Sequence, residues 1–136
     1  MAIKFADRHL KRLRKMTTGM RKEAQKLVYT LADMHATEAA LSITAGSVSG
    51  KNHKPSAPGQ PPNADTGVLD RSVHVEQVGP LQANSVADAP YAAAQEFGSS
   101  TLPERPFMRP AAKKVRKQAD KLAKDAVDRI VKGSKL

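Results

Sequence analysis

Apolar and small side chains recur every three or four residues in the first third of the chain, from Leu13 to Leu41. This spacing places them on one face of an α-helix. The Thr-Thr-Gly run at residues 17–19 interrupts the pattern with poor helix formers. The pattern therefore predicts a helical arm over residues 1–45, made of a short helix followed by a long one.

The helical pattern stops after Ala45, and residues 46–64 form a polar stretch rich in Gly, Ser and Pro. Long structureless segments inside compact domains are uncommon and are usually functional or disordered. We expect a flexible loop that is mobile in the free protein and ordered by contacts in an assembly. At its end, Asp65 can cap a short turn that leads to Leu69.

Short elements are predicted for residues 65–110. Polar and apolar residues alternate over 72–76, as in a half-buried strand, and 84–87 indicates a weaker returning strand. Such a hairpin is not stable alone and must pack on the helices. Residues 91–97, between a proline and a glycine, suggest a short helix.

A last helix is predicted over residues 110–133, because Pro110 suits a first helical position and Gly133 a stop. Its apolar stripe comprises Val115, Ala119, Leu122, Ala126 and Ile130. Asp125 and Arg129 are one of three acid–base pairs spaced to interact along its solvated face. The predicted fold class is therefore α+β, with long N-terminal helices, a long loop, a small antiparallel β-hairpin, a short helix and a C-terminal helix.

The composition adds that any core is thin. The chain of 136 residues is the size of one domain, and only 4% of it is aromatic. Help from partner subunits would compensate for such a core. The absence of cysteine excludes a disulfide framework, a thiolate nucleophile and zinc sites that use sulfur. No apolar run is long enough for a membrane span or a signal peptide, so we expect folding in the cytoplasm and no membrane partner.

Positive charge is concentrated at the two ends of the chain. The net charge is +10, with +7 in residues 1–30, +7 in residues 104–136 and −4 between them. This distribution suggests an anionic partner such as nucleic acid. The basic helices lack aromatic stacking platforms and DNA-reading motifs, so we expect nonspecific contact with double-stranded DNA at most. The candidate DNA-facing residues are Lys11, Arg14, Lys15, Lys113, Lys114 and Lys117.

Candidates for catalysis and metal binding are weak. His35 and Glu38 have a spacing that can hold a metal, but no second such pair completes a site. The remaining three histidines have no serine and acid arranged around them, so they are interpreted as surface residues. Gly59 lies among prolines that remove the backbone donors of a phosphate-binding loop. We expect no enzyme, no catalytic residue, no metal and no cofactor.

Two segments together resemble a known family. The first runs from Ser-Ala-Pro-Gly-Gln-Pro-Pro, at 56–62, to Asp-Thr-Gly-Val-Leu-Asp-Arg-Ser, at 65–72. The second runs from Tyr-Ala-Ala-Ala-Gln-Glu-Phe-Gly, at 91–98, to Arg-Pro-Phe-Met-Arg-Pro-Ala, at 105–111. In this order they are similar to the head-to-tail joining proteins of tailed bacteriophages, also called neck or tail-completion proteins. The resemblance covers nearly the whole chain.

The resemblance implies a structural virion protein in the neck. Copies would form a homo-oligomeric ring, a hexamer or dodecamer, between the portal, adaptor or stopper proteins and the tail-terminator or tail-tube proteins, with DNA passing through. Phe97 and Phe107 would anchor two helices on the hairpin, and Arg105 or Arg109 would pair with Glu96 or with a neighbouring subunit. For these residues, a role at an interface and packing within the chain are equally open. The motif residues with an interface or packing role are Pro58, Gly59, Thr66, Gly67, Leu69, Tyr91, Glu96, Phe97, Gly98, Arg105, Pro106, Phe107, Arg109 and Pro110. The alternative from the residues alone is a small basic accessory protein that binds nucleic acid nonspecifically.

Overall fold

Helices dominate the fold, with one small β-sheet. The computed structural model describes residues 2–133, with side chains from residue 6 onward. The elements are α1 (Ala2–Thr44), a 3-10 turn (Gly50–Asn52), α2 (Val68–Ser72), β1 (Val73–Gly79), β2 (Gln82–Ala87), α3 (Ala92–Phe97) and α4 (Met108–Gly133). The predicted α+β class is confirmed. Within the described residues, no helix is both long and apolar enough to cross a membrane.

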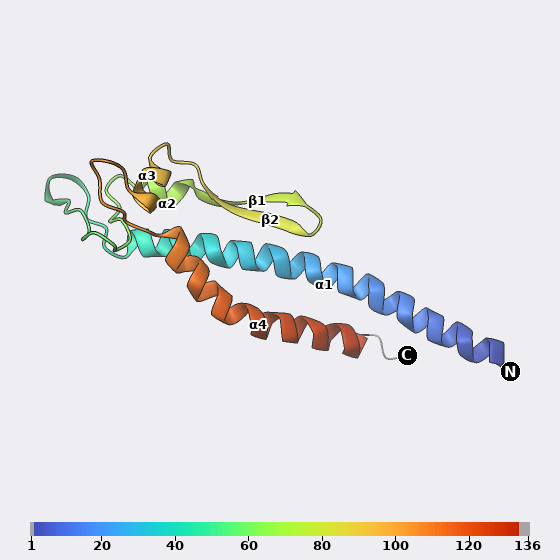
Figure 1. The fold of residues 1–136 in the computed structure, drawn as a ribbon. Helices are drawn as coiled ribbons and strands as arrows, with labels where there is room; N and C mark the ends of the chain where they lie inside the picture. The colour runs from blue at the N-terminus through green and yellow to red at the C-terminus, as the bar shows by residue number, and fades with distance from the viewer. Residues whose placement is uncertain (1, 134–136) are drawn as a thin grey trace.

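Helix α1 is the spine on which the other elements pack (Figure 1). The hairpin of β1 and β2 lies along one side of α1, and α4 runs along the other side. The short helices α2 and α3 gather near the C-terminal end of α1. The N-terminal end of α1 extends past the end of α4, so this part of the spine stands alone.

The predicted break in the N-terminal arm is wrong, because α1 is continuous from Ala2 to Thr44. The hydroxyls of Thr17 and Thr18 donate to backbone carbonyls four residues earlier, at 3.0 and 3.1 Å, and so stay within the helical pattern. A side chain at Gly19 would meet Ile130 of α4 at 3.9 Å. Packing of α4 near Gly19 thus supports the helix where local propensity is poor.

The sheet is a two-stranded antiparallel hairpin. Val73 pairs with Ala87, and the register shifts between Gln77 and Gly79 near the turn. Both strands are longer than predicted, since β1 continues to Gly79 and β2 begins at Gln82. Because the register shifts near the turn, the strands stay paired beyond the residues in which polar and apolar positions alternate.

The core is small and is built mostly from alanines, as the composition predicts. Phe107 and Ile43 are its largest fully buried side chains. Around them pack Ala39, Ala64, Leu69, Ala89, Ala92 and Ala111, with Val73, Ala87 and Met108 at the margin. Phe107 is fully buried in this cluster, which also includes residues of α1, α2 and, at its margin, the hairpin, and this agrees with the expected anchoring role.

Two ion pairs fix the register of α4 on α1. Lys114 bonds the carboxylate of Glu38, and Nε of Arg129 lies 2.9 Å from Glu23 Oε2. Arg129 thus pairs across to α1 and not with Asp125 on its own helix, which corrects the prediction. Spacing rules that consider one helix at a time cannot predict a partner on a neighbouring helix.

Candidate functional site

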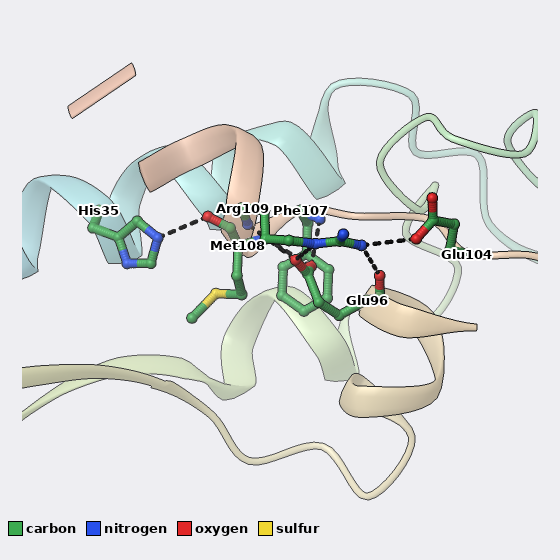
Figure 2. A network of polar contacts seen from close by, with 6 residues as sticks. All are labelled: His35, Glu96, Glu104, Phe107, Met108 and Arg109. Atoms are coloured by element: carbon green, nitrogen blue, oxygen red, sulfur yellow. Dashed lines mark hydrogen bonds and ion pairs between the residues drawn. The ribbon is translucent and has the colours of Figure 1, made fainter. Parts of the chain in front are cut away.

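The two motif segments meet at the start of α4, where Glu96 of α3 binds the backbone (Figure 2). The Glu96 side chain lies under the helix terminus, and the residue is only 4% exposed. Its Oε2 accepts hydrogen bonds from the backbone N–H groups of Phe107 and Met108, at 2.7 and 2.9 Å. Its Oε1 accepts from the N–H of Arg109 at 3.0 Å. One carboxylate therefore holds three consecutive residues.

These bonds satisfy the free donors at the N-terminus of α4. The first N–H groups of a helix have no partner inside it, and a capping side chain usually supplies one. Here Glu96 supplies it from another element, Pro110 has no N–H to satisfy, and the N–H of Ala111 bonds the carbonyl of Phe107 at 3.4 Å. The negative charge also suits the positive end of the helix dipole.

Arg109 closes this cluster from the solvent side. Its Nε donates to Glu96 Oε1 at 2.9 Å, and its Nη2 donates to the Glu96 carbonyl at 2.6 Å and to Glu104 Oε2 at 2.9 Å. The predicted pair between Arg109 and Glu96 is confirmed. We call Glu96, Arg109 and the N–H groups of residues 107–109 the Glu96 clamp.

The charge state of Glu96 follows from two opposed effects. Burial raises the pKa of its carboxyl, but the hydrogen bonds from the N–H groups of Phe107, Met108 and Arg109 and from the Arg109 side chain outweigh burial. The pKa therefore falls below its usual range. With both oxygens occupied and the group buried, Glu96 is a structural anion and not a free general base.

Phe97 is not a buried anchor, which corrects the prediction from the resemblance. It is 68% exposed, and the guanidinium of Arg109 lies over its ring, 5.3 Å from the centroid. Adjacent residues on a helix point about 100° apart. Because Glu96 takes the inward direction, Phe97 is left facing outward.

Arg105 does not pair with an acid but ties the long loop to the segment before α4. Its Nε donates to the carbonyl of Ser56 at 3.1 Å, while its backbone N–H donates to Gln95 at 2.6 Å. Gly59 reinforces the tie, because its N–H donates to the Glu104 carbonyl at 2.9 Å. The predicted mobility of residues 46–64 stays a prediction. The hydrogen bonds of Arg105 and Gly59 hold this loop against the segment before α4 and would reduce its mobility.

Two motif glycines have backbone reasons to be glycine. Gly98 ends α3 with φ of +76°, and an added Cβ would lie 3.0 Å from backbone atoms of Leu102 and Glu104. Gly67 precedes α2 with φ of +73°, and its carbonyl accepts from Arg71 Nε at 2.6 Å. Gly67, and not Asp65, occupies the N-cap position, so the predicted cap is wrong. Asp65 instead accepts from the N–H of Gly50.

The remaining motif residues surround this region without joining the clamp. Leu69 is buried in the core, and the carbonyl of Thr66 accepts from Arg71 at 2.8 Å. Tyr91 precedes α3 and is 42% exposed. Pro58 is exposed and Pro106 is half-buried, while Pro110 is the third residue of α4 and not the first.

Three of the four histidines make local contacts, while His9 is exposed on α1. Nε2 of His35 lies 2.9 Å from the carbonyl of Met108, so this ring links α1 to the start of α4, and Glu38 is engaged by Lys114. His53 contacts the Val48 carbonyl at 2.9 Å. His74 lies 3.4 Å from Glu76 Oε1 and 3.6 Å from Asp88 Oδ2. Among the described residues, no His, Cys, Asp and Glu side chains gather as three or more metal ligands.

The candidate DNA-facing residues occupy two separate places. Lys11, Arg14 and Lys15 are exposed on the projecting part of α1, and Lys113 and Lys117 are exposed on α4. Lys114 differs, because Glu38 already binds its ammonium group. The predicted set is therefore not one continuous patch.

The sequence contained a signal for the clamp that residue spacing alone does not reveal. An acid near the end of a short helix can cap a second helix only when the connection folds back, and Gly98 allows this with its positive φ and the close approach of Leu102 and Glu104. The contributions of Ser56 and Glu104, through one carbonyl and one carboxylate, had no such signal.

Comparisons with protein families, with characterised proteins and with solved structures find no match to this chain.

Proposed function

We propose that the chain is a structural protein in the neck of a tailed bacteriophage, where copies form a ring that joins the DNA-filled capsid to the tail and lines the DNA passage. Its partners are further copies of itself, the neighbouring portal-side and tail-side proteins, and packaged DNA. The proposal originates in the resemblance of two segments. The observations below support it.

The observation that carries the proposal is the Glu96 clamp. The two segments that resemble the family are separated in sequence, yet Glu96 of one binds three N–H groups of the other, and Phe107 beside it fills the core. If the resemblance were due to chance, there would be no reason for the matched residues to contact one another. Their contact supports a shared scaffold.

The exposed surface also supports assembly with neighbours. Leu10, Leu13 and Met20 are about half exposed on α1, and Val78 and Leu81 are exposed on the hairpin. A two-stranded sheet has two free edges, and the core of the chain is small. Contacts between copies in a closed ring would cover these surfaces.

A second candidate is nonspecific binding of nucleic acid by the free protein. The exposed lysines and arginines of α1 and α4 favour it, because such residues neutralise phosphates. It predicts affinity for duplex DNA that falls steeply with salt for the isolated chain. The ring hypothesis requires the charges to approach DNA only within the particle.

Antibody labelling of purified phage particles tests the proposal. We expect label at the junction between head and tail, with a constant copy number in each particle. Particles that lack the chain, in a culture where the protein is made, would refute the proposal. Strongly salt-dependent DNA binding in that case would establish the second candidate.

A further inference from the structure

The first part of α1 is an amphipathic helix that the described residues leave mostly exposed. Residues 6–15 are all exposed, whereas Met16 and Gly19 are half-buried, with Ile130 of α4 beside Gly19. Leu10, Leu13 and Met20 are spaced three and seven residues apart, which places them on one face. They are 50%, 46% and 56% exposed. We call residues 6–20 the projecting arm.

An apolar groove lies elsewhere on the same molecule. It has a volume of about 450 Å³ and lies between the second half of α1 and strand β1. Ala36 and Leu41 line it from the helix, and Val73 and Val75 line it from the strand. Leu41 is 58% exposed, so the groove is open to an incoming side chain.

The charge of the groove is opposite to that of the arm. Among the described residues that line it there is no Lys or Arg, and Asp33 lies in it without a hydrogen bond or ion pair to any described residue. His74, also in the lining, is accompanied by two carboxylates, because its Nε2 lies 3.4 Å from Glu76 Oε1 and 3.6 Å from Asp88 Oδ2. All nine Lys and Arg residues of α1 lie before Leu27, and none follows.

The arm cannot occupy the groove of its own chain. Leu10 and Ala36 belong to one unbroken helix and are 26 residues apart, which corresponds to about 39 Å at 1.5 Å per residue. Bringing them together would require breaking α1. The arm and one wall of the groove both belong to α1. The arm of one copy can therefore reach only the groove of another copy.

We propose that the projecting arm of each copy docks in the groove between α1 and β1 of a second copy, with Leu10, Leu13 and Met20 inserted and the arm's basic face beside Asp33. The contact joins two different surfaces, so each copy offers a free arm and a free groove to further copies. This inference deepens the proposed function, and rests on it for the closure of the series into a ring.

The absence of cysteine in the chain allows a direct test with engineered thiols. Thr17→Cys lies on the apolar side of the arm, and Thr37→Cys lies in the groove lining. The two single variants are purified separately, mixed and treated with a short bismaleimide. Thr101→Cys, exposed in the loop before α4, replaces Thr37→Cys as the matched control.

We expect a covalent heterodimer from the Thr17→Cys and Thr37→Cys mixture and only background from the Thr101→Cys mixture. Adding Leu10→Ser and Leu13→Ser to the arm variant should remove the heterodimer without changing the melting curve measured by circular dichroism, because both side chains are exposed to solvent. A double variant, Thr17→Cys with Thr37→Cys, should give a ladder of multimers.

Equal cross-linking to Thr37→Cys and Thr101→Cys, or unchanged cross-linking after the serine substitutions, would overturn the inference. In the latter case, loss of binding to anionic lipid vesicles by the serine variant would assign the apolar face to a membrane surface. The test uses purified protein alone. Specific cross-linking of a chain that is absent from phage particles would therefore refute the proposed function and retain the arm and groove.

Discussion

Glu96 connects the chemistry of one side chain to the placement of a whole helix. Its carboxylate replaces the cap that α4 does not have in its own sequence, and it accepts hydrogen bonds from three backbone donors and from Arg109. Removing the charge would leave these buried donors facing a weaker or repelling group. Hydrogen bonds to charged groups contribute about 1.5–3 kcal/mol each at most.

We expect Glu96→Gln to lower the free energy of unfolding by about 1–3 kcal/mol, because one amide oxygen replaces two charged acceptors. Chemical denaturation at neutral pH measures the loss. Glu104→Gln is the matched control, since Glu104 is exposed and contacts only the Arg109 side chain of the clamp. Equal stability of the two variants would show that the clamp does not hold α4.

The pH dependence of unfolding tests the same group independently. The pKa of Glu96 is lower in the folded chain than in the unfolded one, where it has its ordinary value. Its stabilising contribution is therefore fully present above the unfolded value and is lost as pH falls through the folded value. Glu96→Gln should flatten the decline of stability in this acid range. A variant that follows the wild-type decline would assign it to other carboxyls.

Phe107 and Phe97 should respond differently to truncation. Phe107→Ala removes a fully buried ring and should cost about 3–5 kcal/mol. Phe97→Ala removes an exposed ring that contacts Arg109 and should cost about 1 kcal/mol or less. Thermal melts of the two variants make the comparison. A similar loss for both would mean that Phe97 is buried in the protein as it exists in solution.

Sequence reasoning could single out both phenylalanines but could not separate them. Each lies in a motif with few aromatics nearby, and the deciding fact is that Glu96 points inward beside Phe97. The pair of Glu96 and Arg109 was accessible from charge alone, whereas the three N–H donors were not. Backbone groups look alike in any sequence, so their partners depend on the fold.

At the scale of elements, helix α1 shows where local propensity loses to packing. Its apolar spacing predicted a helix correctly, and the Thr-Thr-Gly run at 17–19 predicted a break that is absent. Gly19 faces Ile130 of α4, which lies more than a hundred residues later in the chain. Packing against α4 therefore supports the helix at a place where the local sequence does not. The strand ends were likewise extended by an irregular register that alternation does not encode.

Gly19→Ala should stabilise the protein by about 0.5–1 kcal/mol, since alanine favours a helix more than glycine does. The added methyl group would meet Ile130 at an ordinary contact distance of 3.9 Å. The melting temperature measures the change. Gly98→Ala is the contrasting variant and should destabilise, because its φ is positive and backbone atoms lie 3.0 Å from the new Cβ. Destabilisation by Gly19→Ala would restore the predicted break in α1.

At the scale of the whole molecule, the Lys and Arg residues of the long helix α1 are confined to its first part, before Leu27. The basic arm projects at one end of α1, and the core and hairpin gather toward the other (Figure 1). Under the proposed function, this distribution would suit a series of contacts between copies. The basic residues would then act on DNA only within roughly 8–10 Å at ordinary salt, so assembly would have to bring them near it.

Charge reversal on α4 tests the contact with DNA. Lys113→Glu with Lys117→Glu changes two exposed residues and should reduce DNA retention by assembled particles while leaving the subunit folded. Lys114 is left unchanged, because its reversal would break the ion pair with Glu38 and disturb the packing of α4 on α1. Normal DNA retention and infectivity would show that Lys113 and Lys117 form only a solvated face.

Electron microscopy of phage particles produced with the gene for this chain disabled tests the central claim most directly. If the chain forms the ring between capsid and tail, heads filled with DNA, or heads that have lost it, should accumulate beside separate tails. Supplying the wild-type chain should restore joined particles, and supplying Glu96→Gln should restore fewer. Joined, infectious particles at normal yield without the chain would contradict the account.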